Sequence, residues 1–133
     1  MYEICVESEF AAAHFLADFH GKCENLHGHN YKVKAYVRGD DLDEGGMLMD
    51  FSILKAALNE VCKGLDHTHL NEVKENGITV FNNNPSAERI AFYIFSQLKK
   101  TLPRTGEAQL YAVDVFETSK NRARYSMEAV VKV

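Results

Sequence analysis

The sequence predicts an α+β domain: a four-stranded antiparallel sheet with two helices on one face, in the order ββααββ. Three observations lead to this fold class. Apolar and polar residues alternate near both ends of the chain, two central segments repeat apolar residues at helical spacing, and 133 residues is the length of one domain. We therefore expect residues 1–133 to form a single domain with its own core.

Alternation predicts the first two strands. One runs from Tyr2 to His14, and the second from His29 to Arg38. Between them, the stretch from Leu16 to Leu26 is too polar and irregular for either period, so we expect a loop. The second strand has the cleaner apolar face, which consists of Tyr31, Val33, Ala35 and Val37.

Two helices follow the glycine- and aspartate-rich turn at residues 39–46. The first is predicted to begin after Asp50, a capping residue, and to stop at Gly64. The second is predicted to begin near Pro85 or Ser86, because the next residues place apolar side chains at i, i+3, i+4 and i+7.

The last two strands are predicted at Leu110 to Glu117 and at Tyr125 to Val133. In the first of these, Tyr111 and Glu117 are expected to share a face with the valines between them. Two helices cannot cover every apolar strand face in this arrangement. We therefore expect a second copy of the chain to bury the remainder.

Composition and charge exclude several classes of protein. The chain is 46% hydrophobic and 26% charged, which is typical of a globular protein, and its formal charge of -4 argues against a nucleic-acid or membrane-surface binder. No signal-peptide pattern or membrane-spanning run is present, and three cysteines are too few and odd in number for a disulfide framework. We expect a cytoplasmic protein with reduced thiols.

The strongest chemical signal is the sequence His27-Gly28-His29. Residues i and i+2 of a strand point the same way about 7 Å apart, so the two imidazoles can converge on one ion. A catalytic zinc site commonly has three protein ligands, and His14, at the end of the neighbouring strand, is the best third ligand. Iron, cobalt or nickel would also suit imidazoles. The alternative interpretation is a polar strand start without a metal.

Further residues could act beside such an ion. Cys23, four residues before His27, could line the same cavity as a base or nucleophile, or be an inert thiol as we expect for Cys5 and Cys62. The doublet Asp66-His67 is either an acid–base pair or the end of the first helix.

Charged residues near the chain end suggest a binding site. Glu117 ends an apolar strand face, where a carboxylate is costly unless it is paired. It could accept two hydrogen bonds from an amidine- or guanidine-like edge, or simply reach water. Lys120, Arg122 and Arg124, with Lys22, could form a small cationic patch or a solvated hairpin.

Taken together, these residues resemble the 6-pyruvoyl-tetrahydropterin synthase and 6-carboxy-tetrahydropterin synthase superfamily, whose domain is the tunnelling fold (T-fold). The likeness extends over nearly the whole chain. Its blocks, in order, are Phe10–His14, Cys23–Tyr31, Gly46–Phe51, Leu65–Asn71, Asn84–Glu88 and Val115–Thr118.

The resemblance implies roles for individual residues. His14, His27 and His29 match the family's zinc ligands, and Cys23 matches its catalytic thiol. The implied substrate is 7,8-dihydroneopterin triphosphate, and the implied assembly is a homohexamer or tetramer with active sites between subunits. The remaining matches are the acid–base pair Asp66 and His67 and the pterin anchor Glu117, while Ser86 and Glu88 lie in a matching block and could contact substrate. Lys22 and Arg122 are not family matches, but their charge makes them candidate contacts for the triphosphate.

The resemblance leaves more than one pterin product open. Cys23 and His27 are separated by three residues. This spacing resembles the family branch that forms 6-carboxy-5,6,7,8-tetrahydropterin for queuosine, whereas in the biopterin branch the corresponding gap is longer. Glu24 resembles bifunctional members that also form 6-hydroxymethyl-7,8-dihydropterin for folate, or it is a solvated loop residue. A non-catalytic zinc protein, structural or sensory, is the alternative outside enzymes, although such sites usually have four closed ligands.

Overall fold

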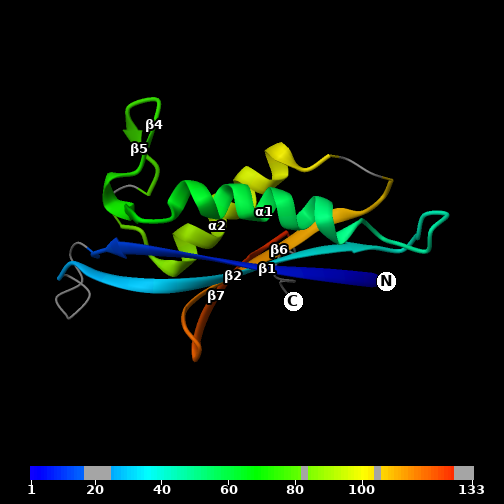
Figure 1. The fold of residues 1–133 in the computed structure, drawn as a ribbon, viewed down its shortest axis with the longest axis horizontal. Coiled ribbons are helices and arrows are strands. Elements are labelled where there is room, and N and C mark those ends of the chain that lie inside the picture. The colour runs from blue at the N-terminus through cyan, green and yellow to red at the C-terminus, as the bar shows by residue number, and fades with distance from the viewer. Residues whose placement is uncertain (17–24, 82–83, 104–105, 128–133) are drawn as a thin grey trace, which may run out of the picture.

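The computed structural model describes residues 1–16, 25–81, 84–103 and 106–127. Its main sheet has the strand order β3-β1-β2-β6-β7. Figure 1 shows both helices on the same side of this sheet. The elements that build this layer pair are β1 (Tyr2–His14), β2 (His27–Gly39), α1 (Phe51–Leu65), β3 (Thr68–His69), α2 (Ala87–Thr101), β6 (Gln109–Thr118) and β7 (Asn121–Ser126).

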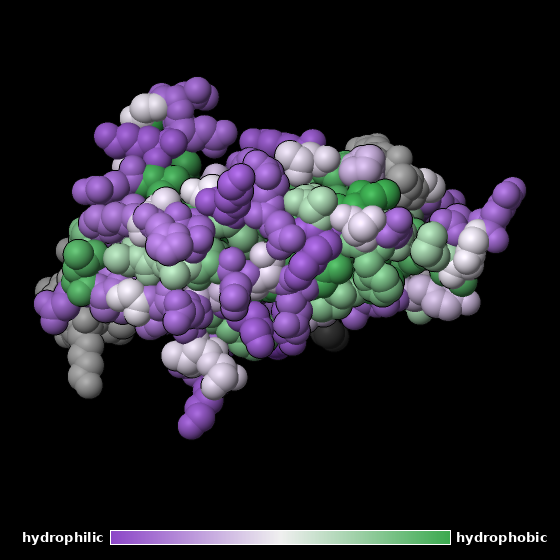
Figure 2. Space-filling view, viewed as in Figure 1, coloured by the Kyte–Doolittle hydropathy of each residue, from purple (hydrophilic) through white to green (hydrophobic). Residues whose placement is uncertain are grey.

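The predicted α+β class and the two-helix layer are confirmed. The four long strands pair antiparallel, and the two-residue β3 is added in parallel beside the end of β1. The short 3-10 helix η2 (Leu70–Glu72) and a hairpin of β4 (Lys74–Glu75) and β5 (Ile78–Thr79) follow. The hairpin projects from one end of the molecule, and its surface is mostly hydrophilic (Figures 1 and 2).

Element boundaries differ from the sequence predictions where a partner overrides local pattern. β2 begins at His27, because His27 pairs with His14. α1 continues through Gly64 and ends at Leu65. β7 begins at Asn121, so Arg122 and Arg124 lie on a strand and not in a loop. Capping was predicted correctly, since Asp50 accepts the Ser52 N–H and Ser86 accepts the Arg89 N–H.

The core lies between the helices and the sheet. The β2 face from Tyr31 to Val37 is fully buried, together with Val113 and Val115 of β6 and the inner faces of both helices. Tyr125 packs against Phe92 and Phe95 of α2. The expectation that a second copy covers the apolar strand faces is therefore wrong for the β2 face and for Val113 and Val115, whereas Tyr125 and Phe92 remain exposed.

The opposite face of the sheet is polar. Its strand positions carry ion pairs such as Glu3 with Arg38 and Glu7 with Lys34. A register shift between Leu110 and Ala112 turns Tyr111 to this face, where the Arg38 guanidinium lies 3.4 Å from its ring centre. Tyr111 therefore lies on the opposite face from Val113, and the prediction from alternation that the two share a face is wrong. Across the described residues, neither helix combines the length and hydropathy needed to span a membrane.

Candidate active site

Three histidines meet where β1 ends and β2 begins. His14 is the direct cross-strand partner of His27, and His29 is paired with Ala12, so all three side chains leave the same sheet face. Their ring nitrogens lie within 4.8 Å of one another. The predicted convergence of His14, His27 and His29 is confirmed, and these residues could hold a metal ion.

The outer nitrogens of two rings are fixed by backbone carbonyls. Nδ1 of His14 lies 2.8 Å from the Pro85 carbonyl oxygen, and Nδ1 of His27 lies 2.6 Å from that of Asn25. Because a carbonyl only accepts, each Nδ1 carries the proton and donates it. The lone pairs of both Nε2 atoms are left free, and these atoms face each other at 2.9 Å.

This arrangement suits a cation. Burial lowers the pKa of His14, and the neighbouring His27 and His29 lower it further, which favours the neutral ring that coordinates metals. Nε2 of His29 is buried and has no hydrogen-bond partner within the described part of the chain. Lone pairs facing one another without a proton repel, and a divalent ion would turn that repulsion into coordination. Three neutral imidazoles fit zinc, iron, cobalt or nickel.

Tyr31 and Pro85 support the site, and sequence reasoning gave neither of them a role in it. The fully buried Tyr31 ring lies edge-on to His14 and His29, and its hydroxyl is 3.2 Å from Nδ1 of His14. Burial raises the pKa of Tyr31 far above that of a free phenol, so the hydroxyl stays neutral. No side-chain pattern in the sequence could have indicated Pro85, because it contacts His14 through its backbone carbonyl.

Glu117 stands beside the histidines. Its Oε1 is 3.9 Å from Nε2 of His14, and a register shift between Phe116 and Thr118 accompanies its position at the end of β6. A hollow of about 420 Å³ opens here. Four residues predicted from the sequence as substrate contacts line it together: Ser86, Glu88, Glu117 and Arg122.

Asp66 and His67 form a hydrogen-bonded pair. His67 adopts a left-handed conformation with φ of 56°, which lets its Nδ1 reach Oδ2 of the preceding Asp66 at 2.9 Å. Sequence neighbours rarely bond in this way, so the doublet alone could not reveal it. The pKa of Asp66 is lowered by the Ala11 N–H it accepts and by His67. The His67 side chain is 84% exposed.

Other predicted residues are not placed at the histidines. Cys23, Glu24 and Lys22 lie outside the described residues. Cys62 is buried in the core, and burial raises its pKa to about 11, which agrees with the expectation of an inert thiol. Cys5 lies exposed on the polar sheet face, far along β1 from His14.

The predicted cationic patch is partly neutralised by a residue that sequence reasoning overlooked. Asp114, fully buried in β6, accepts bonds of 2.7 and 3.1 Å from Arg124 and one of 2.8 Å from the Tyr36 hydroxyl. Arg122 makes a single contact of 3.4 Å to the same carboxylate and remains 50% exposed. A carboxylate inside the run Ala112–Val115 was the available signal.

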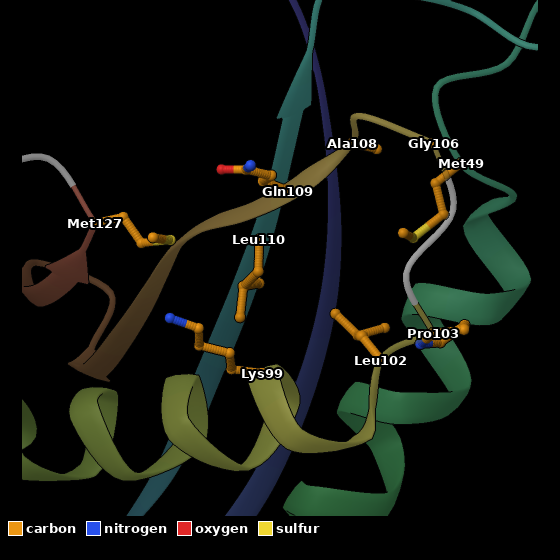
Figure 3. Close-up of a pocket in the computed structure, with 9 residues that line it drawn as sticks. All are labelled: Met49, Lys99, Leu102, Pro103, Gly106, Ala108, Gln109, Leu110 and Met127. Carbon is orange, nitrogen blue, oxygen red and sulfur yellow. The ribbon is translucent and has the colours of Figure 1, made fainter.

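A second hollow lies at the other end of the sheet and lacks this chemistry. Figure 3 shows side chains from the end of α2, the start of β6 and Met49 around a space of about 270 Å³. Of the described residues that line it, Lys99 is the one ionisable side chain. Leu110 in its wall pairs with Val37, ten residues or about 33 Å along β2 from His27. The histidine end is therefore the better active-site candidate.

Comparison with known proteins identifies the family. The family model for 6-pyruvoyl tetrahydropterin synthase matches residues 3–128. The chain belongs to this family. Relatives in this family include pterin synthases, and the resemblance found from the sequence blocks is confirmed.

Three relatives show the range of this family. The chain is 40% identical over 130 residues to the 6-carboxy-5,6,7,8-tetrahydropterin synthase of Synechocystis sp., covering 94% of this chain and 93% of that protein. It is 32% identical to the dihydroneopterin monophosphate aldolase of Pyrococcus furiosus, covering 86% and 88%. The structure of the Caenorhabditis elegans 6-pyruvoyl tetrahydropterin synthase matches with a TM-score of 0.78 and 30% identity, covering 96% and 98%.

Proposed function

We propose that the chain is a zinc-dependent 6-carboxy-5,6,7,8-tetrahydropterin synthase acting on 7,8-dihydroneopterin triphosphate, with loss of triphosphate and acetaldehyde. The observation that carries the proposal is the three-histidine group, with free lone pairs facing inward beside a hollow that contains Glu117. The similarity to the Synechocystis enzyme supports the carboxy product. The proposed reaction belongs to queuosine (7-deazaguanine) biosynthesis in the cytoplasm.

In this proposal His14, His27 and His29 hold the zinc ion. When bound, zinc supplies a Lewis acid that lowers the pKa of nearby substrate hydroxyls. The same three imidazoles could also bind iron, cobalt or nickel, so the choice of zinc is itself part of the proposal.

The other site residues orient the substrate and move protons. The Glu117 carboxylate can accept from the 2-amino and N3 groups of a pterin ring at once. The Ser86 hydroxyl accepts the Arg89 N–H and still has its own proton to donate into the hollow. Cys23 is the proposed base between ring and side chain. Because Asp66 holds Nδ1 of His67, the other nitrogen of that exposed ring is available for proton transfer.

We also propose a homohexamer or tetramer with sites between subunits. Among the described residues, the outer edge of β7 carries no strand partner, and the outer edge of β1 is paired only with β3 at Ala12–Ala13. The exposure of His67 supports a site that another copy completes, because a catalytic imidazole works best shielded from water.

The direct test is to incubate the zinc-loaded protein with 7,8-dihydroneopterin triphosphate and to identify the pterin and the aldehyde by mass spectrometry. The carboxy product with acetaldehyde supports the proposal. A 6-pyruvoyl product without aldehyde would assign the chain to the other synthase branch. No pterin turnover by the zinc-loaded protein would overturn the enzymatic function and leave a zinc-binding protein.

One observation favours a second activity. The Pyrococcus furiosus relative is named an aldolase, and Glu24 follows Cys23 as in bifunctional members that form 6-hydroxymethyl-7,8-dihydropterin. Glu24→Ala is expected to suppress any hydroxymethyl product while carboxy formation continues. Cys23→Ala is expected to abolish both products with zinc content unchanged, and Cys5→Ala, at a remote exposed thiol, is the matched control.

A further inference from the structure

The segment 66–71, which we call the clasp, covers the outer edge of β1 next to the histidines. At its start, the Ala11 N–H donates to Oδ1 of Asp66 at 2.8 Å, and the His67 N–H donates to the Ala11 carbonyl at 2.6 Å. In its middle, Thr68 and His69 pair in parallel with Ala12 and Ala13. The clasp therefore follows β1 residue by residue toward His14.

Asn71 closes the clasp beyond the last strand pair. Its Oδ1 accepts the Phe15 N–H at 2.9 Å, and its Nδ2 donates to the Phe15 carbonyl at 3.0 Å. One side-chain amide thus supplies both hydrogen bonds that a neighbouring strand residue would supply. The Asn71 residue is only 7% exposed, so water does not replace these bonds cheaply.

The position of Phe15 gives this pairing its importance. Phe15 directly follows His14, and the β1–β2 ladder ends at the pair of His14 with His27. Within the described part of the chain, both hydrogen bonds of the Phe15 backbone go to Asn71. The backbone after His14 is thus fixed by Asn71 at the point where β1 ends.

We infer that Asn71 is a positioning residue for the metal site. By holding the backbone of Phe15, it fixes the end of β1 and so keeps Nε2 of His14 aimed at the other two rings. Its amide also joins the segment of Asp66 and His67 to Phe15, the residue that follows the metal ligand His14. The inference rests on the proposed function only in taking the three histidines as the metal site.

The test compares Asn71→Ala with two further variants. Asn71→Asp keeps an acceptor for the Phe15 N–H but loses the donor to its carbonyl. Asn59→Ala is the matched control, because the Asn59 amide oxygen also ties another element to β1, by accepting the Ser8 hydroxyl at 2.7 Å, six residues before His14. Each protein is measured metal-free for amide hydrogen exchange at Phe15, and then for zinc affinity by chelator competition.

Asn71→Ala is expected to weaken zinc binding about 10-fold, the usual effect of losing an outer support of a metal ligand, and to speed exchange at Phe15. Asn71→Asp should retain Phe15 protection and bind zinc with intermediate affinity, while Asn59→Ala should match the wild type in both. Folded Asn71→Ala with wild-type zinc affinity overturns the inference. If Asn71→Ala does not fold, wild-type affinity in Asn71→Asp overturns it. Zinc binding by the wild type without pterin turnover removes the proposed function only.

Discussion

The sheet contains two buried polar clusters that differ in how well their hydrogen bonds are satisfied. Asp114, on the polar face, receives bonds from Tyr36 and Arg124 and a longer contact from Arg122. The histidine cluster, on the helix-covered face, leaves the Nε2 atoms of His14 and His27 opposed and that of His29 without a partner in the described part of the chain.

This difference indicates which cluster stabilises the fold and which one binds a ligand. A buried polar atom without a partner costs roughly 1–3 kcal/mol, so Nε2 of His29, left without a partner in the described part of the chain beside two opposed ring nitrogens, implies that something else binds there. A buried carboxylate whose oxygens are all occupied has no capacity left for a ligand. We therefore read the Asp114 cluster as structural and the histidine cluster as a binding site.

The largest effect is expected for His29→Ala. Loss of one of three ligands should abolish stable zinc binding and lower product formation by about 1,000-fold or more, equivalent to roughly 4 kcal/mol. The metal-free protein should unfold at the wild-type temperature or slightly above, since an unsatisfied buried nitrogen is removed. Zinc affinity and thermal unfolding are the two measurements. A clear loss of metal-free stability would contradict the contrast between the clusters.

Asp114→Ala should show the opposite pattern. Removing the carboxylate leaves Arg124 without its main partner, which is expected to cost about 3–5 kcal/mol of unfolding free energy. Zinc affinity should stay at the wild-type value. Urea unfolding and chelator competition measure the two quantities, with Asp41→Ala, an exposed residue, as control. Weaker zinc binding in a folded Asp114→Ala protein would show that the clusters are coupled.

Acid should weaken the Asp114 cluster selectively. Burial raises the pKa of Asp114, but the bonds from Arg124 and Tyr36 outweigh it and hold the pKa below the ordinary 3.8. A depressed pKa stabilises the fold above about pH 4, and this contribution is lost as pH falls through the folded value. The stability difference between wild type and Asp114→Ala should be constant from about pH 5 to 7 and shrink below about pH 4. A difference that grows on acidification would reverse the sign of this assignment.

Local pattern predicted most of the fold. Alternation located three of the four long strands, and helical spacing with the caps Asp50 and Ser86 located both helices. The strand predicted at Tyr125 to Val133 shares only Tyr125 and Ser126 with β7, and residues 128–133 lie outside the described residues. Features that depend on a distant partner were missed. β2 starts two residues early because of His14, β7 starts four residues early because of β6, and β3 exists only because β1 offers an edge.

The same distinction applies to the site. The histidine spacing, joined to strand geometry, was sufficient to predict a three-ligand group. The Asp66–His67 bond was not predictable, because it needs a left-handed backbone at His67 that no side-chain pattern reveals. The role of Asn71 was also not predictable, since its partner lies in another element, whereas a carboxylate among the apolar residues of β6 could have drawn attention to Asp114.

The smallest effect is expected for Arg122, which stands between the two clusters. It touches Asp114 at 3.4 Å and also lines the hollow beside Glu117, and its half-exposed guanidinium has donors that Asp114 does not occupy. Because an exposed ion pair contributes little, Arg122→Ala should change the unfolding free energy by less than about 1 kcal/mol.

If these free donors bind the substrate's phosphates, Arg122→Ala should raise KM several-fold, up to about 10-fold, with kcat nearly unchanged. Steady-state kinetics of the zinc-loaded enzyme separate the two constants, and Lys74→Ala, which removes an exposed cation from the β4–β5 hairpin, controls for the overall loss of positive charge. An unchanged KM together with a stability loss as large as that of Asp114→Ala would assign Arg122 to the structural cluster. Arg124, which also lines the hollow and gives two of its five N–H donors to Asp114, would then be the remaining described arginine for phosphate.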